Sequence, residues 1–353
     1  MERETIIGMR MRAQRLADSP CVRPEELVAW MGAVQAQDRD MARWAVGMRL
    51  QDGTLNGVRR AADEGKIIRM HMLRPTWHYV AAEDVRWMAA LSARRIRSAV
   101  DSLVRSHRQD ISGRMFARCN DLIARTLEGG RHRTKAEIAE ELGRAGIAAT
   151  PLHVTYYLMR AETDGVVCSG PDRDGKSTYA LLDERVPRMP LLSREEALAR
   201  LAEVYFRSHA PASLADFLWW SGLSLTEARE AVALLGDSLV RERSAGREWL
   251  VHDSCRGGGL SGGGVLLLPA YDQYLIGYKD RSDVLDDCYR ARAFNAWGIF
   301  RPVVLVGGRV AGNWTREVKG GRLRIGTSFF GEAVPDPVSE GEAVERCLSF
   351  WQG

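Results

Sequence analysis

A short stretch near the N-terminus combines residue types that could perform chemistry, Val34-Gln35-Ala36-Gln37-Asp38. Each glutamine amide offers a hydrogen-bond donor and an acceptor, and a carboxylate follows the second amide directly. The two amides share one face only if the backbone is extended, because side chains alternate along a strand but diverge at this spacing on a helix. A site built from the pair therefore requires a turn or an interrupted helix. Spacing alone leaves two interpretations open, a polar turn between helices or a functional site.

The composition is that of a soluble globular protein. The 353 residues are 45% hydrophobic and 27% charged, which suggests two or three structural units with a sizeable core. A net charge of +4 permits a nucleic-acid partner without requiring one. Of the 50 basic residues only five are lysines, so 45 are arginines. Arginine suits bidentate contacts with phosphate and guanine, although codon usage in a GC-rich genome also explains such an excess.

Several classes of protein are disfavoured by what the sequence lacks. The six cysteines are scattered and form no C-x-x-C pair, and no H-E-x-x-H motif occurs, so we expect no disulfide framework, metal or cofactor. The N-terminus has no apolar signal-peptide core. No apolar run reaches the ~20 residues of a membrane span. We therefore expect a reduced, cytoplasmic protein that does not associate with a membrane.

The elements that would position the glutamine pair follow a simple order. Apolar spacing, Pro24 and the acidic residues after it predict helices on both sides of the pair. Two strands then follow, joined by a turn at Arg74-Pro75. Helices followed by a two-stranded ribbon indicate a winged helix-turn-helix unit. The expected helices are 4–18, 24–31, 41–50 and 54–64, and the expected strands are 66–72 and 76–80.

This order of helices and ribbon occurs again twice along the chain. Thr134 and Glu137 form a capping-box pattern in the second unit, and Ser193 and Glu196 do so in the third. A repeat of one supersecondary unit is the strongest architectural signal in the sequence. The predicted helices of these units are 114–128, one that begins at Thr134, 150–162, 193–206, 213–220 and 224–235, and their ribbons are 165–168 with 177–181 and 239–243 with 249–252.

After residue 264 the pattern changes to strands, predicted at 265–268, 274–278, 300–306, 309–314 and 323–325, with a last helix at 338–351. The expected fold is therefore α+β and mainly helical, with three tandem winged helix-turn-helix units in a concave arrangement and a small C-terminal β-rich domain. The expected boundaries are 1–81 for the first winged helix, 82–111 for Arg-rich connecting helices, 112–190 and 191–256 for the second and third winged helices, and 257–353 for the β-rich domain.

Two glycine-rich segments match nucleotide-binding patterns by letter only. Residues 170–177 fit the phosphate-loop pattern, but a strand follows them instead of a helix, and two aspartates inside the loop would repel phosphate. We interpret them as the turn of a wing. Residues 257–262 fit G-x-G-x-x-G but are also followed by a strand, so we interpret them as a flexible loop.

Basic residues fall where winged-helix units usually meet DNA, on third helices and wings. Each could be a solvated surface charge, but their recurrence in three units favours a nucleic-acid surface. The segment 274–282 adds aromatic and basic residues suited to base contacts, or alternatively forms a strand whose aromatics fill the last domain. His78 is expected to be structural or to contact phosphate. The candidate DNA-binding residues are Arg39, Arg43, Arg69, Arg74, His78, Arg160, Arg173, Lys176, Tyr278, Lys279 and Arg281.

Three segments together resemble a known family, the winged-helix DNA glycosylases of the AlkZ-like, azinomycin-resistance type. They are Val34–Asp38, Leu73-Arg74-Pro75-Thr76-Trp77-His78-Tyr79-Val80, and Leu268-Pro269-Ala270-Tyr271-Asp272-Gln273-Tyr274 continuing to Lys279-Asp280-Arg281. The resemblance covers nearly the whole chain. It implies tandem winged helices, double-stranded DNA as partner, and excision of N-alkylated (N7 or N3) purines, with interstrand crosslinks unhooked by some members.

In that family a Gln-x-Gln pair is implied to hold the water that attacks the sugar C1′, and the matching positions are Gln35 and Gln37. Asp38 would either assist electrostatically or cap the following helix. Because an N7-alkylated purine is already a good leaving group, neutral amides that orient water can replace a strong general base. With so few lysines to act as an amine nucleophile, we expect a monofunctional enzyme, and a monomer.

Two other functions remain open at this stage. A DNA-binding transcriptional regulator would use winged helices to recognise a specific sequence, and a non-catalytic family member would bind damaged DNA without cutting it. Regulators usually pair one winged helix with a dimerisation or effector domain, whereas three units and a β-domain suit a protein that wraps one duplex.

Overall fold

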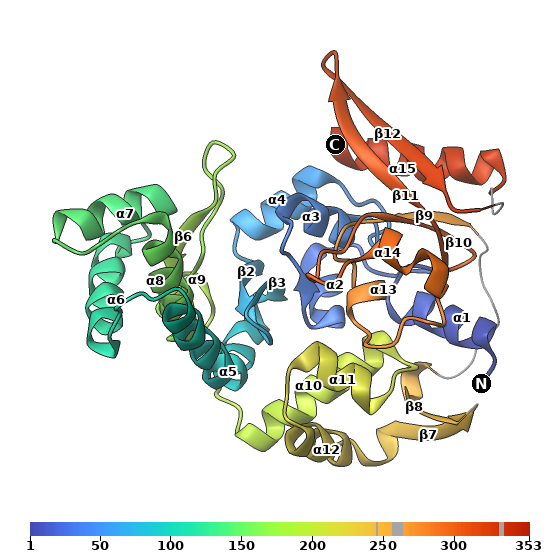
Figure 1. Cartoon of the computed structure of the whole chain (residues 1–353), viewed down its shortest axis with the longest axis horizontal. Coiled ribbons are helices and arrows are strands. Elements are labelled where there is room, and N and C mark those ends of the chain that lie inside the picture. The colour runs from blue at the N-terminus through green and yellow to red at the C-terminus, as the bar shows by residue number, and fades with distance from the viewer. Residues whose placement is uncertain (245, 256–263, 332–334) are drawn as a thin grey trace. The chain divides into compact units, whose positions relative to one another are not determined.

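The computed structural model describes residues 1–244, 246–255, 264–331 and 335–353 of the chain (Figure 1). Helices and small antiparallel sheets alternate along these residues, which confirms the expected α+β, mainly helical class. The chain divides into two compact units. Unit 1 combines residues 1–59 with residues 198–353, and unit 2 is residues 60–197. No helix in the described ranges is long and apolar enough to cross a bilayer.

The N-terminal part of unit 1 carries the glutamine pair between two helices. Pro24 begins one helix at its first position, and Gly32 ends it with a positive φ of 73°. A Cβ at Gly32 would lie 2.2 Å from Cγ1 of Val204, so glycine is required there for packing as well. The elements are α1 (Arg3–Ala13), α2 (Pro24–Met31), β1 (Val34–Gln35), α3 (Arg39–Gly47) and α4 (Leu55–Asp63), the last of which runs across the division between units.

Three helices and a hairpin follow in the second part of unit 1. Ser213 and Ser224 each form a capping box with an acidic residue three positions later, which fixes where two of the helices begin. Ala212 bridges to Leu250, adding a single pair to the hairpin. The elements are α10 (Arg194–His209), α11 (Leu214–Ser221), α12 (Leu225–Leu234), η2 (Gly236–Ser238), β7 (Leu239–Ser244), β8 (Arg247–His252) and η3 (Asp253–Cys255).

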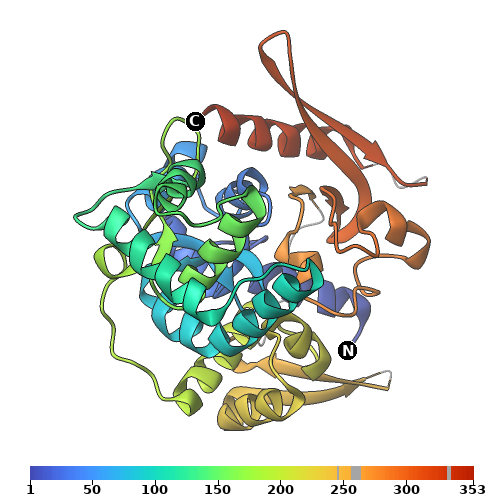
Figure 2. The same ribbon diagram turned by 60° about the vertical axis from the view of Figure 1, so that its left-hand side comes forward.

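A four-stranded antiparallel sheet closes unit 1, in the order β12-β11-β10-β9. The last helix packs against β9 and β12 (Figure 2). The predicted strand at 274–278 is wrong, because this segment is a short helix that begins where Asp272 accepts a hydrogen bond from the Tyr274 backbone N–H. The elements are β9 (Val265–Leu268), α13 (Gln273–Ile276), η4 (Asp287–Tyr289), α14 (Arg290–Ala293), β10 (Val303–Val306), β11 (Arg309–Lys319), β12 (Arg322–Phe329) and α15 (Pro337–Gln352).

Unit 2 begins with a regular antiparallel hairpin, which pairs Ile67 with Ala81 at one end and Met72 with Thr76 at the other. The Arg-rich segment after it is one long helix rather than two. A helix, a short strand, two helices and a hairpin follow, and the last three strands form a sheet in the order β4-β6-β5. The elements are β2 (Ile67–Met72), β3 (Thr76–Ala81), η1 (Ala82–Asp84), α5 (Val85–Ser106), α6 (Gly113–Leu127), β4 (Arg133–Thr134), α7 (Lys135–Arg144), α8 (Pro151–Thr163), β5 (Val167–Ser169), β6 (Thr178–Leu181) and α9 (Leu182–Arg185).

The glycine-rich segment 170–177 joins β5 to β6 and forms a tight turn in which Arg173 pairs with Lys176. Asp174 and Gly175 both adopt positive φ at this turn. A strand and not a helix follows, so the segment lacks the helix N-terminus that a phosphate loop needs, and the prediction of a turn between two strands is confirmed. The other glycine-rich segment, 257–262, lies outside the described residues.

Candidate functional site

The glutamine link, defined here as residues Val34–Asp38, is extended at Val34 and Gln35 and bends before α3 begins. The expectation of a non-helical link is therefore confirmed. The two amides differ in environment, because Gln35 is 4% exposed whereas Gln37 is exposed to solvent. Ala36 between them is fully buried. The link thus places one amide inside the protein and the other at its surface.

The buried amide of Gln35 is incompletely paired. Its Oε1 accepts no hydrogen bond from any residue that the structure describes. A buried acceptor without a donor costs about 1–3 kcal/mol, so native proteins rarely keep one without a reason. An amide oxygen in this state can accept a hydrogen bond from a water molecule or a ligand group.

Asp38 forms the end of the link and the N-cap of α3. Its carboxylate accepts a hydrogen bond from the Met41 backbone N–H at 3.0 Å. Of the two roles considered for Asp38, the structure shows the cap. A cap of this kind fixes the point at which extended backbone changes to helix, and it contributes about 1 kcal/mol.

Tyr271 brings the C-terminal motif to the glutamine link. Burial raises the pKa of the Tyr271 hydroxyl, and the nearby charge of Asp38 raises it further. The residue has a φ of +60°, a conformation that bulky side chains rarely adopt and that recurs at functional sites. Its ring is half-buried beside Phe300. Tyr271 belongs to the C-terminal motif quoted in the sequence analysis, but nothing in that motif indicated that Tyr271 and Asp38 are neighbours.

The residue after Tyr271 anchors this arrangement. Asp272 receives two hydrogen bonds from the Arg49 guanidinium, at 2.7 and 2.8 Å, and both side chains are at least 98% buried. Arg49 also donates to the backbone oxygens of Gln14 and Ala45, at 2.8 and 2.9 Å. Because Arg49 follows α3 directly, this bidentate pair ties the end of α3 to the segment that carries Tyr271.

The Arg49–Asp272 pair is part of a larger group that we call the buried network: Gln14, Arg49, His209, Asp272, Gln273 and Tyr278. Gln14 donates to the Tyr278 hydroxyl at 3.1 Å, and Tyr278 donates to the His209 carbonyl at 2.8 Å. Burial lowers the pKa of His209 to about 3, so its ring is neutral. Tyr278 is fully buried, so the prediction that it contacts DNA is wrong, and the alternative that the aromatics of 274–282 fill the domain holds for Tyr274 and Tyr278.

Contacts of Trp44 also hold α3 in place. Trp44 donates its indole N–H to the Leu267 carbonyl at 2.7 Å and packs against Phe350 with ring centroids 5.1 Å apart. Arg43 is 3% exposed and lies 3.2 Å from Asp40, so this arginine is also misassigned as a DNA contact. Arg39 is half-buried at the first position of the same helix.

In unit 2 the predicted residues of the first hairpin are largely enclosed. His78 is 1% exposed, and burial lowers its pKa to about 3, with nearby Arg74 contributing to the shift. A neutral, buried ring cannot contact a phosphate. Of the two roles expected for His78, structural or phosphate contact, the structure therefore shows the structural one. Arg74 is half-buried at the turn, and burial lowers its pKa to about 10. Arg69 lies with its guanidinium 4.1 Å from the centroid of the Trp77 ring.

The remaining predicted cations of unit 2 divide into paired and exposed ones. Arg160 forms ion pairs with Asp101 at 3.1 Å and Asp164 at 3.2 Å. Arg173 pairs with Glu137 at 2.5 Å from the wing turn. Lys176 is exposed at that turn.

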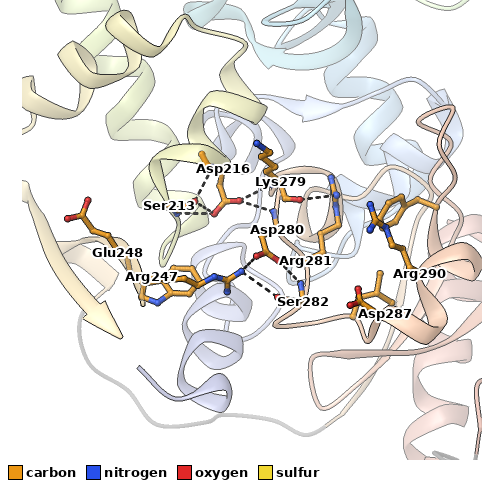
Figure 3. A pocket seen from close by; sticks show the side chains of 14 residues that line it. Ser213, Asp216, Arg247, Glu248, Lys279, Asp280, Arg281, Ser282, Asp287 and Arg290 are labelled. Atoms are coloured by element: carbon orange, nitrogen blue, oxygen red, sulfur yellow. Dashed lines mark hydrogen bonds and ion pairs between the residues drawn. The ribbon is translucent and has the colours of Figure 1, made fainter. Parts of the chain in front are cut away.

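Lys279 and Arg281 line a cavity of about 490 Å³ in unit 1 (Figure 3). Lys279 is exposed, and Arg281 donates to the carbonyls of Leu275 and Lys279 at 2.7 and 3.2 Å. Arg290 lines the same cavity and was not among the predicted residues. Within the described ranges, no group of three or more His, Cys, Asp or Glu side chains could hold a metal ion.

Comparison with known proteins shows the family and the fold of the chain. The chain is 25% identical over 334 residues to the interstrand DNA cross-link repair glycosylase of Streptomyces sahachiroi, covering 88% of this chain and 86% of that protein. The solved structure of the Streptomyces sahachiroi DNA glycosylase AlkZ superposes with a TM-score of 0.81 at 22% identity, covering 99% of this chain and 96% of the other, which shows a shared fold. The family model for DNA glycosylase AlkZ-like proteins matches residues 28–350. The chain therefore belongs to the AlkZ-like family of DNA glycosylases, hydrolases that act on N-glycosidic bonds.

Proposed function

We propose that this protein is a monofunctional DNA glycosylase that excises N7- or N3-alkylated purines from double-stranded DNA, including bulky adducts and interstrand crosslinks. Gln35 and Gln37 position the water that attacks the sugar C1′. The name of the Streptomyces sahachiroi relative supports crosslinks as substrates. The observation that carries the proposal is the buried, unpaired Oε1 of Gln35.

The proposed chemistry needs little from the protein beyond placement. An N7-alkylated purine carries a positive charge, so its glycosidic bond breaks without a strong acid to protonate the base. The remaining need is a water molecule oriented toward C1′ as the sugar develops oxocarbenium character. An acceptor such as Gln35 Oε1 can fix one water hydrogen, and the exposed Gln37 amide can complete the orientation when DNA is bound.

DNA binding in this proposal uses winged helix-turn-helix units at 1–81, 112–190 and 191–256, joined by 82–111 and followed by the β-rich region 257–353. The order α6, β4, α7, α8, β5, β6 supports the second unit, and the order α10, Ala212, α11, α12, β7, β8 supports the third. We propose that the protein acts as a monomer in the cytoplasm, with contacts to DNA from Arg39, Arg69, Arg74, Arg160, Arg173, Lys176, Lys279 and Arg281.

The test is excision of a single 7-methylguanine from a labelled duplex, followed as strand cleavage at the abasic product. Gln35→Ala and Gln37→Ala should each slow single-turnover excision by about 100-fold, the lower range for a lost proton- or water-orienting group. Gln51→Ala is the matched control, because Gln51 is an exposed glutamine of the same unit that donates to the Ser19 carbonyl. It should leave the rate unchanged.

Two outcomes would overturn the proposal. The first is that the wild-type protein excises neither 7-methylguanine, 3-methyladenine nor a nitrogen-mustard crosslink. The second is that both glutamine variants retain the wild-type rate. A sharp footprint on one undamaged sequence would favour the regulator instead.

A further inference from the structure

A cavity of about 490 Å³ in unit 1 contains Lys279 and Arg281 in its lining. It lies between the start of α11, the start of β8 and the segment 279–294 (Figure 3). The buried Trp249 and the half-buried Phe294 supply aromatic surface to its lining. The cavity is nucleotide-sized and open to solvent, so its charged residues decide which ligand it accepts.

Three of the four carboxylates that line the cavity already have partners. Asp216 accepts hydrogen bonds from the backbone N–H groups of Lys279 and Asp280, at 2.8 and 3.2 Å, and from the Ser213 N–H and hydroxyl. Asp280 forms an ion pair with Arg247. Glu248 pairs with Arg241 at 3.3 Å outside the lining. Asp287 is the fourth, and it is exposed.

The cations on the side of the cavity formed by residues 279–294 are differently placed. Figure 3 shows Lys279, Arg281 and Arg290 following one another along this side. In the part of the chain that the structure describes, the Lys279 and Arg290 side chains form no ion pair or hydrogen bond, and Arg290 lies 5.3 Å from the centroid of the Phe294 ring. Arg281 is held by hydrogen bonds to the carbonyls of Leu275 and Lys279. Lys279 and Arg290 therefore outnumber Asp287, the exposed acid of the lining.

A row of packed aromatic rings, with Phe300 buried at its centre, connects the wall of this cavity to the glutamine link. Arg281 lies over Phe294 and Phe300, at 4.8 and 5.1 Å from their ring centroids. Phe300 in turn lies beside Tyr271, whose hydroxyl is close enough to Asp38 for that charge to raise its pKa. This packing ties the wall of the cavity to the glutamine link, so the strand that we assign to the cavity is the one that carries the lesion.

We propose that this cavity binds one phosphate of the DNA backbone that flanks the lesion, through Lys279 and Arg290. The inference rests on the proposed function in one respect, that the strand in the cavity belongs to the substrate DNA. The built parts of the site are the Asp216 carboxylate that fixes the backbone of Lys279, and the Arg247–Asp280 pair that fixes the next residue. Lys279, on this fixed backbone, and Arg290, which lies over the Phe294 ring, then remain for an anion.

Salt dependence of binding to an undamaged duplex tests this inference. Each phosphate contact contributes about 0.9 to the magnitude of the slope of log K against log salt concentration. Lys279→Gln and Arg290→Gln should therefore each reduce that magnitude by about 0.9, and each should weaken DNA binding equally on unrelated sequences. Lys279→Arg keeps the positive charge and should keep the wild-type slope. The matched control is Arg105→Gln, which removes one exposed arginine from α5 in unit 2 and should leave the slope unchanged.

The result that would overturn the inference is an unchanged slope in folded Lys279→Gln and Arg290→Gln proteins, with folding checked by circular dichroism and thermal melting. An equal loss in Arg105→Gln would also overturn it, because the cavity would then be no different from any surface charge. Titration with inorganic phosphate and a deoxynucleoside monophosphate distinguishes the phosphate source. Saturable binding of either that Lys279→Gln abolishes, with an unchanged DNA slope, would assign the cavity to a free phosphate compound and refute the DNA assignment.

These results are independent of catalysis. If the wild-type protein excises no damaged base but Lys279→Gln lowers the salt slope, the proposed function fails and the phosphate site stands. If excision depends on Gln35 and the slope does not change, the reverse holds.

Discussion

Two sets of buried polar groups in unit 1, the buried network and the glutamine link, are satisfied to very different degrees. In the buried network, Arg49, Asp272, Gln14, His209 and Tyr278 all find partners, and Gln273 Nε2 is the only side-chain atom of that group without one in the described residues. In the glutamine link, the buried Gln35 leaves its acceptor unpaired.

This difference distinguishes polar groups that stabilise the fold from a polar group that can still bind water or substrate. A polar group whose bonds are all made inside the protein has no capacity left for a substrate, and its removal is felt mainly as lost stability. A buried acceptor that the fold leaves open costs stability and keeps its capacity for water or substrate. Under the proposed function, the same type of side chain, glutamine, serves the first purpose at position 14 and the second at position 35.

The largest effect is expected from breaking the charged pair of the buried network. Asp272→Ala leaves the Arg49 guanidinium buried without its counter-ion, and we expect a loss of about 3–5 kcal/mol in the free energy of unfolding, measured by urea denaturation. The control is Asp286→Ala, which removes partly exposed ion pairs with Arg3 and Arg309 and should cost about 1 kcal/mol. Similar losses in the two variants would mean that the network does not anchor α3.

An intermediate effect is expected from pH, through His209. Its folded pKa of about 3 lies below the ordinary value of about 6.5, so the unfolded chain binds a proton first as the pH falls. The contribution of the neutral His209 ring to the free energy of unfolding is therefore fully present above about pH 6.5. Below that pH it decreases by about 1.4 kcal/mol per pH unit, until the pH approaches about 3. His78 adds a loss of the same sign in unit 2.

Denaturation between pH 7.5 and 5.0 measures this loss before most carboxylates titrate. Histidine ring signals in NMR provide the check, since the rings of His209 and His78 should not titrate in that range. A flat stability profile from pH 7.5 to 5.0, or a His209 ring that titrates near pH 6.5, would contradict the buried neutral state.

The smallest effect on stability is expected at the link itself. Gln35→Met removes the unpaired acceptor at similar volume, so the free energy of unfolding should stay within about 0.5 kcal/mol of wild type or rise, while excision is lost. Gln14→Met is the matched variant, since it removes hydrogen bonds to Arg49 and Tyr278 and should cost about 1–3 kcal/mol. Equal losses at the two positions would show that Gln35 has a structural partner.

The sequence predicted most elements because their ends are determined locally. The capping box of Thr134 and Glu137 forms with Thr134 accepting from the Glu137 N–H at 3.3 Å, and α7 begins where that pattern indicated. Pro24, Pro151 and Asp38 likewise act within one helical turn of their own position. The extended character of the glutamine link also followed from local spacing, since a functional pair at that spacing required it.

Features set by distant partners could not be predicted in the same way. The aromatic and β-favouring residues of 274–278 suggested a strand, but Asp272 caps a helix there while its carboxylate is held by Arg49, 223 residues earlier. Burial of Tyr278 depends on contacts with Gln14 and His209. A single sequence carries no record of such pairings.

Counting basic residues by position also overstated the predicted DNA surface at Arg43, which is buried. Arg160 and Arg173 form ion pairs with acids, which their positions in the sequence did not indicate. Arg290 belongs to no motif, yet it lines the cavity beside Lys279. Whether a cation is available depends on its neighbours in space rather than on its place in a repeat.

The packing of α3 has a consequence for how the protein is made. The helix that follows the glutamine link rests on Leu267, Asp272 and Phe350, whereas unit 2 is one continuous stretch of chain. At a synthesis rate of roughly 5–20 residues per second, residues 60–350 take about 15–60 seconds to follow residues 1–59 out of the ribosome. Unit 2 can fold during that interval, whereas α3 lacks its C-terminal packing partners until the last helix is made. A nascent chain can therefore contain a folded unit 2 before the helix that follows the glutamine link is fixed in place.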